Sequence, residues 1–268
     1  MTSNDAVLLS ITDQIATITL NRPDRMNALD QSMIEGLGTA LDRIEADIAH
    51  IGAIIIEGSG GTFMAGGDVK FFYELSKNPA EESRPQIETM INRVHDIITR
   101  LTALPRPVIA KLDGAVAGFG ISLMNACDLA VAAEETVFTL AYIHIGTSPD
   151  GGSTHSLPRL VGMKKAKEIA FLGDRFTATD AHECGLVNKV VPADQLASAT
   201  AKYAARLAAG PRDALARTKA LLNTAPENDL AKQLALEATA FADCAGSHDF
   251  REGVSAFVEK RSPQFGKS

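Results

Sequence analysis

Residues 107–120 read PVIAKLDGAVAGFG, a continuous apolar run followed by a turn that contains three glycines. The run Val108–Leu112 has the pattern of a buried strand, and the glycine turn after it leads into a helical segment. An earlier stretch has the same arrangement, because the apolar run Ala53–Glu57 precedes the glycine-bearing turn Phe63–Asp68. Buried strands that alternate with turns and helices predict the α/β fold class.

The rest of the chain fits that class. Val7–Ser10 and Ile15–Leu20 alternate apolar and polar residues around a short turn, which predicts a hairpin. Asp30 stands where an N-cap is expected, and apolar residues then recur at helical spacing as far as Ile48. We therefore expect mixed strand pairing, with further strands at Ala130–Ala133 and Val187–Val191 and helices at Glu88–Leu101 and Lys165–Leu172.

From Ala193 onward the apolar residues fall only at helical spacing, and Gly210-Pro211 and Ala225-Pro226 divide the region into three expected helices. We predict a core over residues 1–195 and a helical oligomerisation segment over 196–268. Lys77–Pro85 contains two prolines and several charges, so we expect a mobile connection that could act as a lid.

Composition narrows the class of partner. The 268 residues carry 26 Lys plus Arg against 33 Asp plus Glu, for a net charge of −7, and no basic stripe appears. Nucleic acid is therefore not expected as a partner. No apolar run approaches the roughly 18 residues that a bilayer span requires, and the polar N-terminus has no signal-peptide pattern. We expect no membrane association, a cytoplasmic location, and three reduced thiols at Cys127, Cys184 and Cys244.

The two glycine turns are the first candidates for chemistry. Where a strand leads into a helix, backbone N–H groups lack intrahelical partners and the helix dipole is positive, so two such turns could stabilise an oxyanion. The alternative is that the glycines only permit tight turns and close packing. A phosphate-binding loop is disfavoured because neither turn is followed by Gly-Lys-Ser/Thr.

Asp150 lies in the Pro/Gly-rich turn 148–153, just before the helical run Leu157–Val161. A carboxylate there can form the turn, cap the helix, or act as a base. The six histidines show no metal-binding spacing, and no Gly-x-Ser-x-Gly motif exposes a serine. We therefore expect neither a metal site nor a Ser-His-Asp hydrolase.

Taken together, these stretches resemble the crotonase superfamily, the enoyl-CoA hydratase/isomerase family, over nearly the whole chain. The resemblance rests on several motifs in the family's order, namely Asn21-Arg22-Pro23, Met26–Leu29, Phe63–Asp68, Pro107–Ala110, Asp113-Gly114, Asp128-Leu129, Pro149–Ser153, Leu157–Gly162 and Ala181–Val190. It implies a crotonase-like spiral of ββα units, a C-terminal helical trimerisation segment, and a homotrimer or dimer of trimers. It also implies an acyl-CoA thioester as substrate, with coenzyme A as part of that substrate and no separate cofactor.

Matched by position, the oxyanion-hole amides are those of Gly67 and Phe119. The substrate's CoA part is expected near the segments Arg25–Ala28 and Ala65–Val69, which include Asp68, and near Lys260. For Asp68 we expect a helix-capping side chain. The resemblance also implies that Asp150 occupies the acidic position of relatives with a Pro-Asp-x-Gly-Gly pattern.

The positions where the family's hydratases carry two catalytic glutamates are Ser122 and Tyr142 here. Adding water needs one group to activate the water and another to supply a proton, whereas one carboxylate suffices to move a double bond. We therefore expect an acyl-CoA isomerase, with Asp150 as proton shuttle and Ser122 and Tyr142 binding substrate or only lining the pocket. Two alternatives stay open: a hydratase with a non-standard acid/base set, and a non-catalytic acyl-CoA-binding protein.

Overall fold

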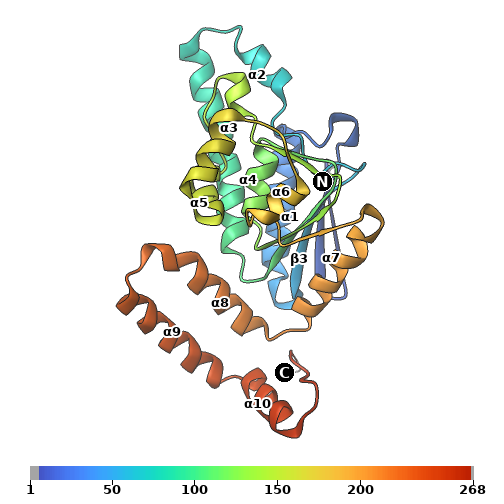
Figure 1. The fold of residues 1–268 in the computed structure, drawn as a ribbon, viewed down its shortest axis with the longest axis vertical. Helices are drawn as coiled ribbons and strands as arrows, with labels where there is room; N and C mark the ends of the chain where they lie inside the picture. Colours follow the sequence, from blue (N-terminus) through green and yellow to red (C-terminus); the bar gives the residue numbers. More distant parts are fainter. Residues whose placement is uncertain (1–5, 267–268) are drawn as a thin grey trace.

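The computed structural model describes residues 6–266, which fold around a six-stranded sheet flanked by helices (Figure 1). The strand order is β1-β2-β3-β4-β6-β9, and the strands are Val7–Thr12, Ile15–Leu20, Ala53–Gly58, Val108–Leu112, Leu129–Ala133 and Lys189–Val191. The core helices are α1 (Gln31–Ala46), α2 (Val69–Leu75), α3 (Ala80–Ala103), α4 (Phe119–Asn125), α5 (Ser153–Leu172), α6 (Ala178–Glu183) and α7 (Ala193–Ala208). The α/β class is confirmed.

The expected N-terminal hairpin is present. Strands β1 and β2 pair antiparallel from Val7↔Leu20 to Thr12↔Ile15. Asp13 and Gln14 connect them with φ values of 49° and 66°, a left-handed two-residue turn that matches the twist of paired strands. All other neighbours in the main sheet are parallel, so the sheet is mixed as predicted.

Each face of the main sheet packs against a different layer. One face contributes Ile54, Ile56 and Ala110 to the larger core, which contains residues of α1, α3, α4 and α5. The other face contributes Ile109 and Val131 to a smaller core closed by α7. Strands buried on both faces explain why the sequence showed continuous apolar runs rather than alternation.

A second sheet of three short strands was not predicted. It consists of β5 (Ala115–Ala117), β7 (Val137–Thr139) and β8 (Phe176–Thr177), in that order. Two or three residues are too few to show a periodic pattern, which explains the omission. This sheet positions the second glycine turn, because β5 leads directly into Gly118 and the N–H of Gly118 donates to Thr139 O at 2.9 Å.

The expected connection Lys77–Pro85 is shorter in the structure, because it is helical from Ala80 onward, and its role as a mobile lid stays a prediction. Helix α2 ends at Leu75, and α3 begins at Ala80 and includes Pro85. Ser83 is buried, and its hydroxyl donates to Leu75 O at 2.7 Å, which ties the first turn of α3 to the end of α2. The acidic residues in that first turn also favour a helix N-terminus.

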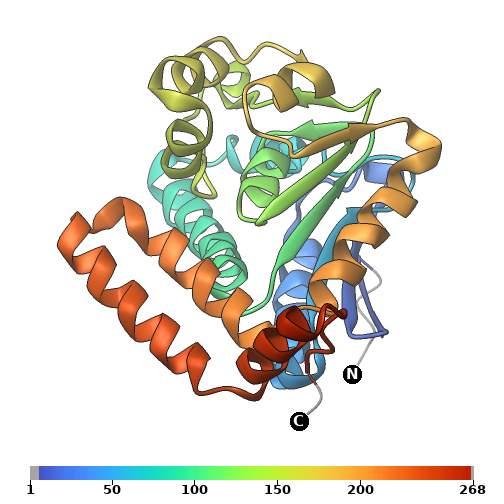
Figure 2. The same ribbon diagram turned by 60° about the horizontal axis from the view of Figure 1, so that its bottom comes forward.

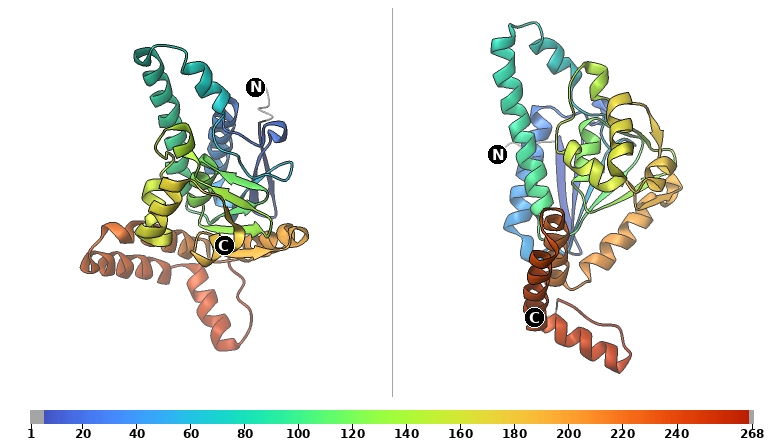
Figure 3. Two further views of the ribbon diagram at one scale, coloured as in Figure 1. Left: turned by 45° about the horizontal axis from the view of Figure 1, so that its top comes forward. Right: turned by 60° about the vertical axis from the view of Figure 1, so that its left-hand side comes forward.

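From Ala193 to residue 266 the chain forms four α-helices rather than the three helices expected. After α7 come α8 (Arg212–Thr224), α9 (Leu230–Ala245) and α10 (His248–Glu259). Ser247 begins the additional helix by accepting a hydrogen bond from Phe250 N. Helix α7 crosses the predicted boundary at 195/196 and packs on the main sheet, whereas α9 and α10 extend beyond it (Figures 2 and 3).

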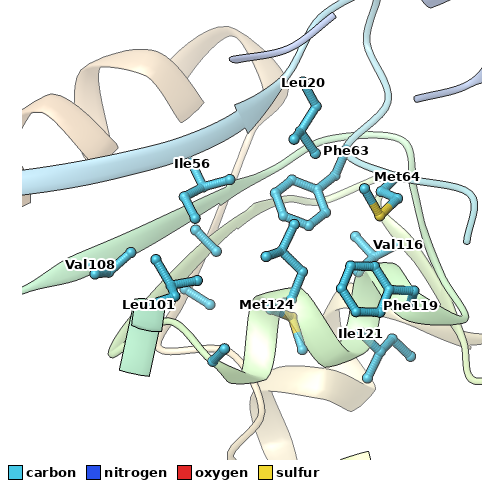
Figure 4. Close-up of a cluster of buried hydrophobic side chains, with 14 of the residues drawn as sticks. Leu20, Ile56, Phe63, Met64, Leu101, Val108, Val116, Phe119, Ile121 and Met124 are labelled. Atoms are coloured by element: carbon cyan, nitrogen blue, oxygen red, sulfur yellow. The ribbon is translucent and has the colours of Figure 1, made fainter. Parts of the chain in front are cut away.

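The core reaches the second glycine turn directly. Phe119, the first residue of α4, is 2% exposed and points toward Met64 and Val116 (Figure 4). Both polar groups of the Met64 backbone also bond to β5. The N–H donates to Ala115 O at 3.0 Å, and the carbonyl accepts from Ala117 N at 2.8 Å. The two glycine turns are therefore fixed to one another by both packing and hydrogen bonds.

Candidate active site

The two predicted oxyanion turns lie in direct contact. A Cβ atom added to Gly118 would stand 3.4 Å from the Cα atom of Gly66, and both residues have positive φ values, 48° and 94°, which favour glycine. Gly67 follows Gly66, and Phe119 follows Gly118. The structure thus brings together the two residues whose amides the sequence predicted to act as a pair.

Both amides are available to a ligand. On either side of Gly67, the carbonyl of Gly66 and the N–H of Asp68 bond to Leu29 at 2.8 and 2.9 Å, which fixes the peptide but leaves the Gly67 N–H unused. Phe119 is the first residue of α4, where N–H groups have no intrahelical partner. Within residues 6–266 neither amide hydrogen donates to another group.

Asp150 lies against the second of these turns. A Cβ atom on Gly151 would stand 2.8 Å from Cε2 of Phe119 and 2.6 Å from Cβ of Ser122, and Gly151 has a φ of 58°. A glycine at 151 is therefore required both by the backbone conformation and by the packing on α4. This contact places the Asp150 backbone beside the helix whose first amide is the proposed oxyanion donor.

The Asp150 carboxylate is partly buried and has a hydroxyl partner. Tyr142, in the 3₁₀ turn η3 (Tyr142–Ile145), donates its hydroxyl hydrogen to Oδ1 of Asp150. Burial raises the pKa of Asp150 above that of an aspartate in water, while the Tyr142 hydrogen bond, and the positive charge of His95 when its ring is protonated, act in the opposite direction. Burial and the Asp150 charge also raise the pKa of Tyr142, so the phenol stays a donor.

Ser122 contacts the backbone of Asp150. Its side chain is buried, and Oγ donates to the Asp150 carbonyl at 2.9 Å and lies 2.6 Å from Oγ of Ser153. This hydroxyl bonds to protein groups in the structure, and the role of Ser122 in binding substrate or lining the pocket stays a prediction. Tyr142 likewise directs its hydroxyl to Asp150.

The segments expected near the CoA part lie side by side. The N–H of Ala65 donates to Met26 O at 3.0 Å, which joins the stretch Arg25–Ala28 to the first glycine turn. Asn27 is fully buried and fixes this arrangement, donating to the carbonyls of Ser59 and Thr62 at 3.0 and 2.6 Å. Arg25 is exposed in this segment, and CoA binding there stays a prediction.

The two residues that follow Gly67 begin α2. The Asp68 carboxylate accepts from Lys70 N at 3.1 Å, so the expected capping role is confirmed, and Val69 is 54% exposed at the start of the helix. Lys260, in contrast, ends α10, which lies at the opposite end of the molecule from α2 (Figure 1). Within one chain the structure does not bring Lys260 to the other predicted site residues.

Sequence analysis missed two residues that contact the Asp150 turn. His95 on α3 accepts a hydrogen bond at Nε2 from Gly151 N at 3.2 Å, and Ser153 pairs with Ser122. Ser153 was visible as a neighbour of Asp150 in the turn motif. For His95 the local sequence offers no signal, because the contact joins residues 56 positions apart.

Comparisons with known proteins identify the family. The sequence model of the enoyl-CoA hydratase/isomerase family matches residues 10–268. The chain belongs to this family. Enoyl-CoA hydratase/isomerase relatives include 1,2-epoxyphenylacetyl-CoA isomerase of Escherichia coli (strain K12), 36% identical over 97% of each chain. Crotonyl-CoA hydratase of Syntrophomonas wolfei is 34% identical over 97% of each chain.

Solved structures show the same family fold. The crystal structure of an enoyl-CoA hydratase from Polaromonas sp. JS666 superposes with a TM-score of 0.90 at 35% identity, covering 97% of this chain and 99% of that one. The crotonase fold is therefore established for this enoyl-CoA hydratase/isomerase family member, and the family assigns it to enzymes acting on acyl-CoA thioesters. Within residues 6–266 no helix is both long and apolar enough to cross a bilayer.

Proposed function

We propose that this enzyme is an acyl-CoA isomerase in which Asp150 moves a proton along the acyl chain. The observation that supports the proposal is the pair of hydrogen bonds that two hydroxyl groups donate to Asp150. Ser122 and Tyr142 occupy the positions that match the catalytic glutamates of the family's hydratases, and both hydroxyls bond to Asp150 itself. The site thus presents one carboxylate beside two unpaired amides, which is the set that a one-base proton transfer needs.

For a β,γ-unsaturated thioester, Asp150 removes a proton from the α-carbon and the electron pair moves toward the thioester oxygen. The Gly67 and Phe119 amides donate hydrogen bonds to the resulting enolate oxygen, where the negative charge is greatest. Protonated Asp150 then returns a proton to the γ-carbon, and the double bond comes to lie between the α- and β-carbons. One carboxyl group serves both steps because it ends each cycle ionised.

The buried environment of Asp150 supports this role. Because burial raises the pKa of the carboxyl group, its anion is a stronger base than an aspartate in water. The rearrangement of a related unsaturated or epoxidised acyl group would use the same two parts, an enolate-stabilising pair of amides and one base. The acyl group is therefore defined here by its chemistry, an acyl chain with an acidic α-proton.

The test is incubation with a β,γ-unsaturated acyl-CoA in H₂¹⁸O. We expect ultraviolet absorbance of the conjugated thioester to appear without solvent oxygen in the product. Asp150→Asn should lower turnover by roughly 10³-fold, within the range that general acid–base groups supply, while CoA binding persists. Incorporation of ¹⁸O would favour the hydratase alternative, and CoA binding without turnover of any unsaturated thioester would favour a non-catalytic binding protein.

A further inference from the structure

Both polar groups of the Asp150–Gly151 peptide bond are held by side chains from two different helices. The Asp150 carbonyl accepts a hydrogen bond from Ser122 Oγ of α4 at 2.9 Å. The Gly151 N–H, on the opposite edge of the same peptide, donates to Nε2 of His95 on α3 at 3.2 Å. Gly151 is buried, so its N–H depends on this partner rather than on water.

Holding both edges of a peptide bond fixes its plane, because the peptide unit is rigid. The plane in turn sets the rotation of the Asp150 residue about its Cα–C bond, and with it the direction in which the carboxylate leaves the backbone. A third contact, from the Tyr142 hydroxyl to Oδ1, fixes the carboxylate itself. A base that must reach two carbons of one acyl chain depends on such orientation, since small misplacements cost large factors in rate.

We propose that His95 and Ser122 are positioning residues that clamp the Asp150–Gly151 peptide and thereby aim the Asp150 carboxylate at the substrate. This inference rests on the proposed function of Asp150. His95 does not itself take the substrate proton in this arrangement, because its Nε2 lone pair is occupied by the Gly151 N–H. Its ring is therefore neutral, with the proton on Nδ1.

The clamp is sensitive to the charge of His95. The residue is exposed, so the ring can exchange protons with solvent. A proton on Nε2 would convert the acceptor into a donor that faces the Gly151 donor, and that side of the clamp would open. The imidazolium would also stabilise the nearby Asp150 anion and make it a weaker base.

Among the groups around His95, Asp150 is the titratable neighbour at the site. On α3 the positions three and four residues away are Ile91, Asn92, Ile98 and Thr99, which do not titrate. The nearby charges of α3 are engaged elsewhere, since Arg93 faces Glu35 of α1 and Asp96 faces Arg100. On the first turns of α5, His155 and Arg159 are exposed, and on η3 Tyr142 bonds to Asp150.

A matched pair of variants tests the clamp through kcat and KM for isomerisation. His95→Leu removes the acceptor, and we expect kcat to fall roughly ten-fold with KM changed less than about two-fold. His95→Gln keeps an acceptor oxygen without a titrating ring, so kcat should return to within about three-fold of wild type. For Ser122, Ser122→Ala should lower kcat in the same way, and Ser122→Thr should restore it.

The ring itself gives a readout that mere destabilisation would not move. Nitrogen-15 NMR should show the neutral His95 ring with its proton on Nδ1, the resonance being assigned by its absence in His95→Gln. A proton on Nε2 of the neutral ring, or equal kcat values for the Leu and Gln variants, would overturn the clamp.

Failure of the clamp and failure of the proposed function give different results. An Asp150→Asn variant that keeps wild-type turnover would overturn the assignment of Asp150 as the base, and the clamp's role in catalysis with it. An inactive Asp150→Asn variant combined with wild-type kcat in His95→Leu would overturn the positioning role alone. Thermal unfolding of each variant verifies that the compared proteins are folded at the assay temperature.

Discussion

The hydroxyl of Tyr142 donates its hydrogen to the carboxylate of Asp150, so the two side chains form one acid–base unit. The bond favours the ionised form of Asp150 and opposes the effect of burial. The basicity of Asp150 is therefore a balance between a buried position and a phenol donor, and the phenol is the part that a single substitution can remove.

For Tyr142→Phe we expect the pKa of Asp150 to rise further, because burial then acts without the opposing hydrogen bond. Asp150 must be ionised to act as a base, so the acid limb of kcat should move to higher pH. Above that limb, kcat should fall about ten-fold, because the carboxylate loses the hydrogen bond that fixes its orientation. A kcat–pH profile of both proteins measures this, and an acid limb moved to lower pH would contradict the assignment.

Gly151→Ala should damage both stability and catalysis. The new methyl group would stand 2.6 Å from Cβ of Ser122 at a residue whose φ is 58°, so both strain and a clash result. We expect a loss of about 3 kcal/mol in the free energy of unfolding and at least a ten-fold fall in kcat. Denaturant unfolding and steady-state kinetics give the two numbers.

Gly61→Ala is the matched control, because Gly61 has a similar φ of 70° with nothing within 4 Å of an added Cβ. This variant should lose about 1 kcal/mol from backbone strain alone and keep wild-type kcat. Equal losses in the two variants would mean that the packing of Gly151 on α4 contributes nothing.

The sequence could predict the start of a helix where the residues that define it are neighbours in the chain. Asp30 was identified as an N-cap from the residues that follow it, and it accepts from Met33 N at 2.9 Å. The two glycine turns could be predicted because a strand, a turn and a helix are contiguous in the chain, whereas the choice of the Gly67 and Phe119 amides within them came from the family resemblance. Ser247 caps α10 through a residue only three positions away, so this helix start could also have been predicted but was not.

What sequence could not supply is contact between distant segments. His95 was visible only as a polar residue in an amphipathic helix, and its bond to Gly151 depends on how α3 packs against the turn before α5. Pro85 misled for a related reason. A proline with neighbouring charges is typical of a loop, yet the contact of Ser83 with Leu75 secures the first turns of α3.

Lys219 attaches α8 to the core, and its removal should be costly. Its Nζ lies 2.8 Å from Oδ2 of Asp128, which also accepts from Val108 N at 2.7 Å, and the lysine side chain is 8% exposed. Lys219→Met leaves a mostly buried carboxylate unpaired, so we expect a loss of about 3 kcal/mol in the free energy of unfolding at pH 7. The Asp128→Asn, Lys219→Met double variant should recover part of this loss.

The Lys219–Asp128 pair also predicts the direction in which stability changes with pH. Burial raises the pKa of Asp128 even with Lys219 present, and removing Lys219 raises it further. The folded Lys219→Met protein then binds more protons than the unfolded chain, so its stability falls as pH rises through the folded-state pKa. Its deficit against wild type should shrink as the pH is lowered toward about 4. A deficit independent of pH would contradict the pairing.

The predicted homotrimer or dimer of trimers can be tested at α10. Phe257 is 85% exposed and Val258 73% exposed in the single chain, which is unusual for large apolar side chains. Phe257→Glu should reduce the mass measured by analytical ultracentrifugation, while Lys232→Glu, at an exposed polar position of α9, should leave it unchanged. A wild-type mass for Phe257→Glu would place any subunit interface elsewhere.

Because Gly66 and Gly118 are in contact, the amides proposed to stabilise the enolate are positioned by different parts of the chain from the groups proposed to transfer the proton. The spacing of the Gly67 and Phe119 amides is set where main chain meets main chain, with no side chain between them. Proton transfer, in contrast, depends on replaceable side chains of other segments. In the proposed function, substitutions at 95, 122, 142 and 150 would therefore change the proton-transfer groups while the two main-chain amides stay in place, which would suit this scaffold to re-engineering its chemistry.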